Sequence, residues 1–413
     1  MRGEQDLVRT LRTAADQVEG LDLAGGVARR RRALRTRRRV GVALAAAAVV
    51  AIVGGTTVAL SGGEQRAQPA EIVTPEVPKI TPVEQLWPRA VVKMPAKKWK
   101  PVTGLSPTQV LLAANSAFEK AGQLGVYDSA RGTTRVLGDI PSPKKKYYPQ
   151  KFAVSSRYIA WYGETPQDDD PWADFWIMPR EGGTARRVTE VTADVDAIGL
   201  TGDSLVWSVR GGGVYRVPLT GGKPSRVPGS DGLHLTAWPW ANGRASKEPG
   251  ANENRVVNLE TGRSVDVPLP PQVQMTQCHA EWCVGVSGGR MIVQRVDGTG
   301  RKTLPVMFRP HGARWLLGDR YAMFGVYDET RRGLPIAVVY DLATGVTAGL
   351  GEKSEPWVSG SVMMGANSSA PSTTPSWDAD VTYHRECGNG RCVVKTRGGG
   401  KQLTVVNLLA ATR

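Results

Sequence analysis

The stretch IAVVYDLATGVTAGL, residues 336 to 350, decides the fold. It reads as an apolar strand, a short turn ending in glycine and a second strand, which is the pattern of a β-hairpin. Glycine supplies the positive φ that such a tip requires. The pattern occurs about seven times along the chain. The other copies are LGVYDSARGTTRVLG (124 to 138), FWIMPREGGTARRVTE (175 to 190), VYRVPLTGGKPSRVP (214 to 228), NRVVNLETGRSVDVP (254 to 268), MIVQRVDGTGRKTLP (291 to 305) and CVVKTRGGGKQLTVV (392 to 406).

Apolar strand pairs lie between these hairpins, at residues 152 to 164, 196 to 210, 275 to 287, 313 to 328 and 357 to 366. Near-continuous apolar runs fit strands that are buried on both faces. The repeat spacing of roughly 35 to 55 residues matches one four-stranded propeller blade. We therefore predict an all-β fold, a β-propeller of about seven four-stranded blades over residues 108 to 413. Six or eight blades are the alternatives, because the segments 231 to 275 and 351 to 390 are irregular.

One hairpin and the strand before it carry a resemblance to a known family. The residues are Val339, Tyr340, Asp341, Leu342, Thr344 and Gly345, preceded by Gly318 to Ala322. They resemble the blades of bacterial TolB-like and WD40-like β-propellers, here attached to a membrane anchor. The resemblance implies the propeller fold, which serves many functions. The Gly-His and Trp-Asp residues of true WD40 blades are absent, so no partner surface is carried over.

A hydrophobic run from Val40 to Leu60 contains no charged residue and is long enough to cross the hydrocarbon core as a helix. Eight arginines precede it: Arg29, Arg30, Arg31, Arg32, Arg35, Arg37, Arg38 and Arg39. The positive-inside rule keeps such a cluster in the cytoplasm. We predict a single-pass protein of the cell membrane with a transmembrane helix at residues 40 to 61, which contacts the lipid bilayer through residues 40 to 60. The alternative is a cleaved signal peptide, although no clear cleavage site follows.

Two further segments flank the predicted span. Residues 1 to 39 form a basic cytoplasmic tail with a short amphipathic pattern, which lies on the inner membrane surface or binds a cytoplasmic protein. Residues 62 to 107 are rich in proline and predict an extended extracytoplasmic spacer. The formal charge of +15 comes in large part from the tail. We therefore expect no nucleic-acid partner.

The four cysteines form two pairs with the same spacing, Cys278 with Cys283 and Cys387 with Cys392. Four intervening residues allow two strands of a tight hairpin to bring the sulfurs together. The predicted extracytoplasmic location is oxidising, which favours two disulfides. A zinc site is the alternative, because His279 lies within the first pair.

Two other clusters are candidate ligand sites. Asp168, Asp169, Asp170 and Asp174 are close enough on one predicted loop to hold Ca²⁺, or form a solvated charged loop. No other cofactor is expected. Trp238 and Trp240 flank a proline in a predicted exposed loop that would stack on a sugar or a peptide, although most tryptophans are expected between blades.

No catalytic constellation is evident. His234, His279, His311 and His384 lie in different repeats without a nucleophile motif nearby, and we interpret them as blade or loop residues. The sequence favours a non-enzymatic binding, sensing or scaffold module that engages an unknown envelope ligand or protein at its propeller face. The alternative is a cell-envelope hydrolase or metal-dependent lyase on that face. A purely structural envelope component is a third hypothesis.

Overall fold

The structure is a computed structural model, and it describes residues 79–95, 98–114, 122–144, 147–164, 171–244, 252–312, 315–327, 334–351, 372–379, 381–388, 391–398 and 401–411. These residues belong to one compact unit, Pro75–Arg413. The predicted tail (1–39), the transmembrane helix (40–61) and the eight arginines before it all lie outside the described residues. Among the residues that are described, no helix has the length and apolarity needed to cross a bilayer.

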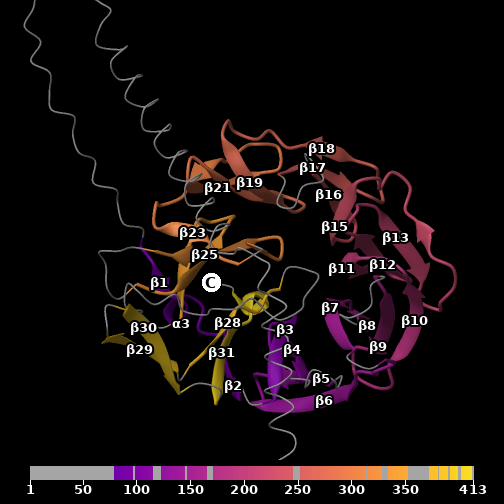
Figure 1. Cartoon of the computed structure of the whole chain (residues 1–413), viewed down its shortest axis with the longest axis horizontal. Coiled ribbons are helices and arrows are strands. Elements are labelled where there is room, and N and C mark those ends of the chain that lie inside the picture. Colours follow the sequence, from indigo (N-terminus) through magenta and orange to yellow (C-terminus); the bar gives the residue numbers. More distant parts are fainter. Residues whose placement is uncertain are drawn as a thin grey trace, which may run out of the picture. The chain divides into compact units, whose positions relative to one another are not determined.

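The described residues form eight β-sheets, of which seven are arranged around a central axis (Figure 1). The prediction of an all-β propeller with about seven blades is confirmed. Blade one contains β3 (Trp99–Ser106), β4 (Gln109–Ala114), β5 (Gln123–Asp128) and β6 (Thr133–Asp139). Blade two contains β7 (Tyr148–Val154), β8 (Tyr158–Glu164), β9 (Ala173–Pro179) and β10 (Arg186–Val191). Blade three contains β11 (Val195–Leu200), β12 (Ser204–Val209), β13 (Val214–Pro218) and β14 (Ser225–Arg226).

The next two sheets repeat this antiparallel order. Blade four contains β15 (Leu233–Ala237), β16 (Trp240–Arg244), β17 (Glu253–Asn258) and β18 (Ser264–Asp266). Blade five contains β19 (Val273–Cys278), β20 (Trp282–Ser287), β21 (Arg290–Arg295) and β22 (Lys302–Thr303).

The sixth and seventh sheets use both ends of the described chain. Blade six contains β23 (Phe308–Pro310), β24 (Leu316–Leu317), β25 (Tyr321–Val326), β26 (Ala337–Asp341) and β27 (Thr347–Leu350), and the short β1 (Thr81–Pro82) pairs with β27 in parallel. Blade seven consists of β28 (Ser376–Asp378), β31 (Gln402–Val406) and β2 (Val91–Pro95). The short helix α3 (Val83–Leu86) connects β1 to β2, and the 3₁₀-helix η1 (Leu408–Ala410) follows β31.

The ring is closed by pairing an early strand with a late one. β2 runs antiparallel to β31, with Val91 opposite Val406 and Pro95 opposite Gln402. Residues 79–95 and 98–107 therefore belong to the propeller, although the sequence predicted an extended spacer up to residue 107. Proline and lysine, which made this segment look like a linker, occupy exposed positions of its strands: Lys93 and Pro95 in β2 and Lys100 in β3.

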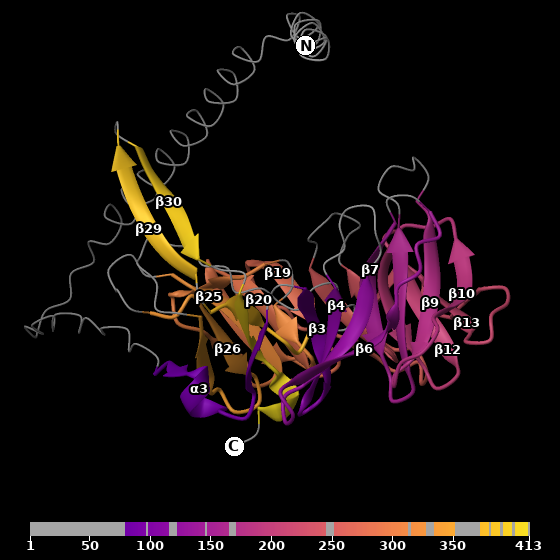
Figure 2. The ribbon, with the colours of Figure 1, turned by 90° about the horizontal axis from the view of Figure 1, so that it is seen from below.

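One predicted hairpin is wrong. Residues 392 to 406 do not pair with each other; instead β29 (Val381–Gly388) pairs with β30 (Arg391–Gly398), while β31 joins blade seven. The hairpin β29–β30 extends away from the ring (Figure 2). The sequence pattern identified the turn-forming glycines correctly but assigned two consecutive strands to one hairpin.

Hydrophobic clusters fill the junctions between neighbouring blades. Each of the seven clusters among the described residues combines side chains from two consecutive sheets. At the junction of blades two and three, for example, the rings of Phe175 and Trp207 lie 4.6 Å apart. The cluster that contains Met94, Trp99 and Leu403 joins blade seven to blade one. A blade cannot cover both of its own faces, so burial between neighbours holds the ring together.

The repeated hairpin turn has a physical basis in Asx capping. In blade six, the Asp341 carboxylate accepts hydrogen bonds from the amides of Ala343 and Thr344, and Gly345 follows with a φ of 78°. Asp128 in blade one and Asn258 in blade four make the same pair of bonds to the turn that follows them. These short polar side chains hold the turn in place, and the glycine adopts the left-handed conformation that closes it.

Candidate functional site

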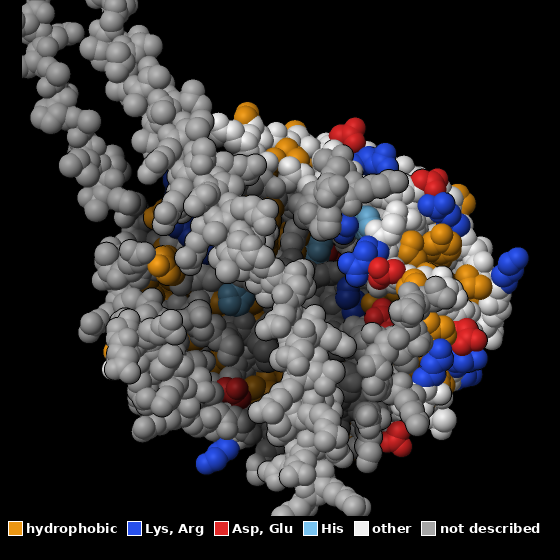
Figure 3. Space-filling view, in the orientation of Figure 1, with side chains coloured by type: hydrophobic (Ala, Val, Ile, Leu, Met, Phe, Trp, Pro, Cys, Tyr) orange, Lys and Arg blue, Asp and Glu red, His pale blue; other side chains and the backbone are white. Residues whose placement is uncertain are grey.

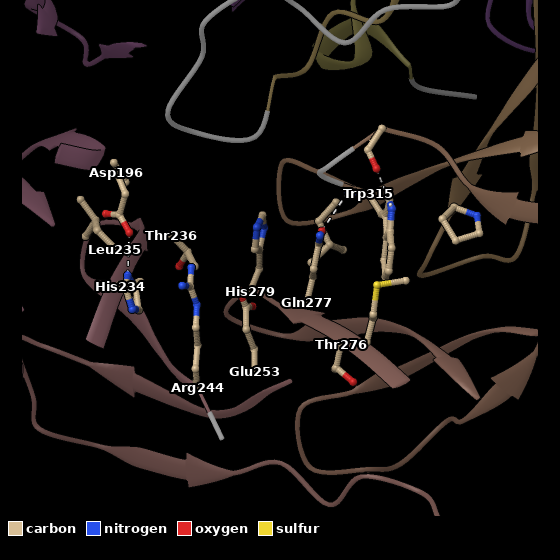
Figure 4. Close-up of a pocket in the computed structure, with 15 residues that line it drawn as sticks. Asp196, His234, Leu235, Thr236, Arg244, Glu253, Thr276, Gln277, His279 and Trp315 are labelled. Carbon is tan, nitrogen blue, oxygen red and sulfur yellow. Dashed lines mark hydrogen bonds and ion pairs between the residues drawn. The ribbon is translucent and has the colours of Figure 1, made fainter. Parts of the chain in front are cut away.

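A cavity of about 360 Å³ is bounded by the inner strands of blades three to six (Figure 4). Blades three and four contribute Asp196 and Ala197 from β11, His234, Leu235 and Thr236 from β15, Arg244 from β16 and Glu253 from β17. Blades five and six contribute Met275, Thr276 and Gln277 from β19, His279 after it, Pro310 from β23, Leu316 from β24, and Gly312 and Trp315. The register of blade four explains why distant residues meet, because Arg244 ends β16 next to the start of β15. Figure 3 shows histidine side chains near the centre of the face seen in Figure 1.

A hydrogen-bonded chain of three side chains forms one wall. The Nδ1 atom of His234 lies 2.6 Å from Oδ2 of Asp196. The hydroxyl of the buried Ser208 donates to Oδ1 of the same carboxylate and accepts a bond of 3.0 Å from the amide of Leu235. The backbone carbonyl of Asp196 accepts a further bond from Nζ of Lys151. These contacts tie blades two, three and four together beside the cavity.

The charge of Asp196 is stabilised in this wall. Burial on its own raises the pKa of Asp196, but the hydrogen bonds from His234 and Ser208, with the charges of His234 and Lys151, outweigh it and hold the pKa below the usual value. Asp196 is therefore ionised at neutral pH. An ionised carboxylate only accepts hydrogen bonds, so Nδ1 of His234 carries the proton and its Nε2 is the remaining atom for a ligand.

The opposite part of the wall is held by bonds to backbone groups and to the side chain of Asn242. The carboxylate of Glu253 accepts a 2.7 Å bond from the amide of Cys278 and a second bond from the side-chain amide of Asn242. Nδ1 of His279 lies 3.0 Å from the carbonyl oxygen of Gly318, so this nitrogen is also the donor. Figure 4 shows the side chains of Arg244, His279 and Gln277 rising from their strands in the same direction.

The fold is a seven-bladed β-propeller. No protein-family profile matches the sequence, and no curated protein matches it either. Solved structures show a similar fold. An uncharacterized protein from Listeria monocytogenes matches 68% of this chain and 92% of its own at 9% identity and a TM-score of 0.44. TolB from Acinetobacter baumannii matches 74% of this chain and 65% of its own at 11% identity and a TM-score of 0.32.

An oligogalacturonate lyase from Vibrio parahaemolyticus matches 77% of this chain and 92% of its own at 8% identity and a TM-score of 0.42. The likeness of this propeller to all three proteins concerns the fold alone. The chemistry of the cavity has to be inferred from its own residues.

The predicted cysteine pairs lie in hairpins. Cys278 and Cys283 form a disulfide with an S–S distance of 2.03 Å at the turn between β19 and β20. Cys387 is also disulfide-bonded, and the register of β29 and β30 places it opposite Cys392. The first disulfide leaves no thiolate for zinc, and it lies against the cavity wall, because the Cys278 amide holds Glu253.

The predicted acidic cluster is not assembled within the described residues. Asp168, Asp169 and Asp170 lie outside them, whereas Asp174 is fully buried in β9, where it accepts a 2.7 Å bond from the indole of Trp176. Among the described residues, no group of three or more His, Cys, Asp or Glu side chains is arranged to hold a metal ion. Asp174 belongs to the strand and not to the loop before it.

The predicted stacking pair is packed against the blades. Trp238 is half-buried against the core between blades three and four, and its indole donates a 2.9 Å bond to Glu260. Trp240 packs against the core between blades four and five. Neither ring lines the cavity.

Sequence reasoning missed Asp196, Arg244 and Glu253, and it read His234 and His279 as ordinary blade residues. The available signal was their position in the repeat. Asp196 and His234 each occupy the second residue of an inner strand, and equivalent positions of inner strands surround the propeller axis. Polar residues at these positions of consecutive blades would have indicated a common site.

Proposed function

We propose that this protein is a non-enzymatic binding module whose propeller takes a small polar ligand in the cavity between blades three and six. The observation that carries the proposal is the cavity wall, in which polar side chains are fixed by bonds to other groups of the protein. Asp196 is held by Ser208 and His234, and Glu253 by the backbone of Cys278. A cavity of about 360 Å³ suits a small molecule. Fixed polar groups supply specificity at a low entropic cost.

A second part of the proposal concerns where this module lies in the cell. We propose a single membrane span with the N-terminus in the cytoplasm and the propeller outside, supported by the arginines before residue 40. Such a layout suits binding, sensing or an envelope scaffold. Sensing requires that the tail bind a cytoplasmic protein. Capture experiments with residues 1–39, compared with a tail of scrambled sequence, test that step; equal recovery of proteins by both would refute it.

Ligand screening of the full-length chain tests the binding function. Anything that binds the folded state raises the thermal midpoint, so envelope sugars, short peptides and Ca²⁺ are tested separately. Met275→Trp places a large side chain in the cavity at a residue that is 38% exposed, and it should abolish the stabilisation. Val306→Trp is the matched control, because Val306 is 52% exposed and does not line the cavity. Stabilisation that survives Met275→Trp would place the ligand elsewhere.

An enzyme is the second candidate, and the bond between Asp196 and His234 is the observation that favours it. A carboxylate that orients a histidine is a common arrangement for a general base in hydrolases and lyases. Ser208, however, donates to Asp196 and is fully buried, so it is not placed to give its proton to His234 as a nucleophile. His234→Gln would abolish an activity of purified protein on envelope polymers if His234 were the base. Unchanged turnover in this variant would exclude that role.

A further inference from the structure

Blades three and four each have an arginine at the end of their second strand, but only the arginine of blade three has an acidic residue opposite it. In blade three, Arg210 follows β12 and lies opposite Asp194, with its Nε 2.5 Å from a carboxylate oxygen. In blade four, Arg244 ends β16 at the equivalent position. The register of β15 and β16 places Gly232 opposite Arg244, at the position that Asp194 occupies in blade three. The acid that would pair with Arg244 within its own blade is therefore missing, and its guanidinium lines the cavity.

The other acids near Arg244 have partners of their own. Asp231, the neighbour of Gly232, lies 2.6 Å from Nη2 of Arg226. Glu253 is opposite Arg244 in the ladder between β16 and β17, but its carboxylate bonds to the Cys278 amide and to Asn242. Asp196 is occupied by His234 and Ser208. Within the described part of the chain, Arg244 makes no ion pair or side-chain hydrogen bond.

Two histidines complete the lining. Nδ1 of His234 donates to the Asp196 carboxylate, so the Nε2 end of this ring is left for the cavity, and Nδ1 of His279 donates to the backbone carbonyl of Gly318. The cavity thus offers one permanent cation, Arg244, while the carboxylates of Asp196 and Glu253 accept hydrogen bonds from donors of the protein.

We propose that the ligand of this cavity is a small molecule bearing an oxyanion, a carboxylate or a phosphate, that Arg244 binds through its guanidinium. This inference rests on the proposed binding function and adds the chemical class of the ligand. A guanidinium presents two parallel N–H donors that match an oxyanion, and such charge-assisted bonds are about twice as strong as neutral ones. The missing acid at Gly232 is what leaves Arg244 available.

The test compares three probes built on one sugar. Glucose is neutral, glucuronate carries a carboxylate and glucose 6-phosphate a phosphate, and titration calorimetry of the full-length chain measures the affinity for each. We expect one or both charged probes to bind at least about tenfold more tightly than glucose. A tenfold difference corresponds to about 1.4 kcal/mol, and one charge-assisted hydrogen bond contributes at least that much. Preference for glucuronate identifies a carboxylate ligand, and preference for glucose 6-phosphate a phosphate ligand. Equal binding of all three overturns the inference.

Matched variants at Gly232 locate the effect. Gly232→Asp restores in blade four the acid that blade three has, and Gly232→Asn has the same shape without the charge. A Cβ at Gly232 meets nothing within 4 Å, and both residues tolerate its φ of 69° better than other side chains do. We expect Gly232→Asp and Arg244→Gln each to lose about tenfold in affinity for the charged probe, and Gly232→Asn to bind like the natural protein.

The outcomes separate this inference from the proposed function. Unchanged affinity in Arg244→Gln overturns the role of Arg244. Equal loss in Gly232→Asp and Gly232→Asn shows an effect of shape, and it overturns the role of the missing acid. If the charged probes fail but a neutral compound binds in a manner that Met275→Trp abolishes, the binding function stands and the oxyanion inference falls. If no compound of either kind binds, both fall.

Discussion

His234 Nδ1 lies 2.6 Å from Asp196 Oδ2, so a charge-assisted hydrogen bond joins the inner strand of blade four to that of blade three. Both side chains are largely shielded, with exposed fractions of 12% and 19%. The bond has two consequences. It adds a polar contact to the hydrophobic junction between these blades, and it fixes the ring of His234 at the cavity.

Replacing Asp196 should weaken the junction more than replacing its exposed neighbour Asp194. Asp196→Asn removes the charge that His234, Ser208 and Lys151 stabilise, and we expect it to cost about 1–3 kcal/mol of unfolding free energy. Asp194→Asn breaks an exposed ion pair with Arg210, for which about 0–1 kcal/mol is expected. Urea unfolding of both variants at pH 7 measures the difference. Equal costs would show that the bond to His234 contributes no more than a surface pair.

The contribution of Asp196 also depends on pH with a defined sign. Its pKa in the folded state is lower than the unperturbed value of 3.8, so its stabilisation is complete above that value. The stabilisation is lost as the pH falls through the lower folded pKa. The gap in stability between the natural protein and Asp196→Asn should therefore narrow below about pH 4. A gap that is constant from pH 7 to pH 3 would contradict this account.

Asp174 should show the opposite sign. Burial raises the pKa of Asp174 to about 6, in spite of the bond from Trp176. The folded state then binds a proton more tightly than the unfolded state does, and stability falls as the pH rises from about 4 to 6. Asp174→Asn keeps an acceptor for Trp176 without the buried charge. At pH 7.5 we expect this variant to be more stable than the natural protein by up to about 3 kcal/mol, at about 1.4 kcal/mol per pKa unit.

Thermal unfolding between pH 4 and pH 8 tests this expectation, with the exposed Asp266→Asn as the control. The control should follow the natural protein within about 0.5 kcal/mol at every pH. Asp174→Asn should converge with the natural protein near pH 4, where the carboxyl group is protonated in the folded state. A less stable Asp174→Asn variant at pH 7.5 would mean that the charge is needed for packing in blade two.

The fold could be predicted from local turn chemistry, because each repeat carries its own signal. Asp341 caps the turn that Gly345 closes, and the same arrangement at Asp128 marks a blade more than 200 residues earlier. Ring closure has no such local signal. The pairing of Val91 with Val406 is decided by which strand the last blade lacks, and this is a property of the whole ring.

The site was harder to predict because its residues belong to different repeats. Asp196 and His234 are 38 residues apart and become neighbours only through the stacking of blades three and four. Arg244 carries no motif at all. Its availability depends on the residue across the strand pair, Gly232, and such a missing partner is visible only once the register is known.

Removal of the first disulfide should loosen the cavity wall as well as the turn. Cys278→Ala together with Cys283→Ala opens a short loop, for which chain entropy gives a loss of about 2 kcal/mol. The amide of Cys278 also holds the Glu253 carboxylate, so ligand affinity should fall with stability. The matched control is Ser287→Ala at the far end of β20. Reduced stability with unchanged ligand affinity would show that the wall does not depend on the disulfide.

Truncation tests the contribution of residues 79–107 to the ring. This segment places Val92, Met94, Trp99 and Val102 in the core, each with an exposed fraction of 8% or less. A chain of residues 108–413 lacks β1, β2 and β3, which leaves blade seven without its outer strand and blade one without its inner strand. Apolar faces and strand edges would be exposed at the junction of these two blades. We expect this chain to aggregate or to lack a cooperative urea transition.

A chain of residues 79–413 retains every described strand, and it should unfold cooperatively at the midpoint of the full-length protein. Point variants make the comparison independent of solubility. Met94→Ala removes a side chain that is 1% exposed, and a cost of about 2–5 kcal/mol is expected. Lys93→Ala, its exposed neighbour in β2, should change stability by about 0.5 kcal/mol or less. The same urea midpoint for residues 108–413 and residues 79–413 would contradict this account. It would mean that β1, β2 and β3 contribute nothing to stability and that β28 and β31 close the ring by themselves.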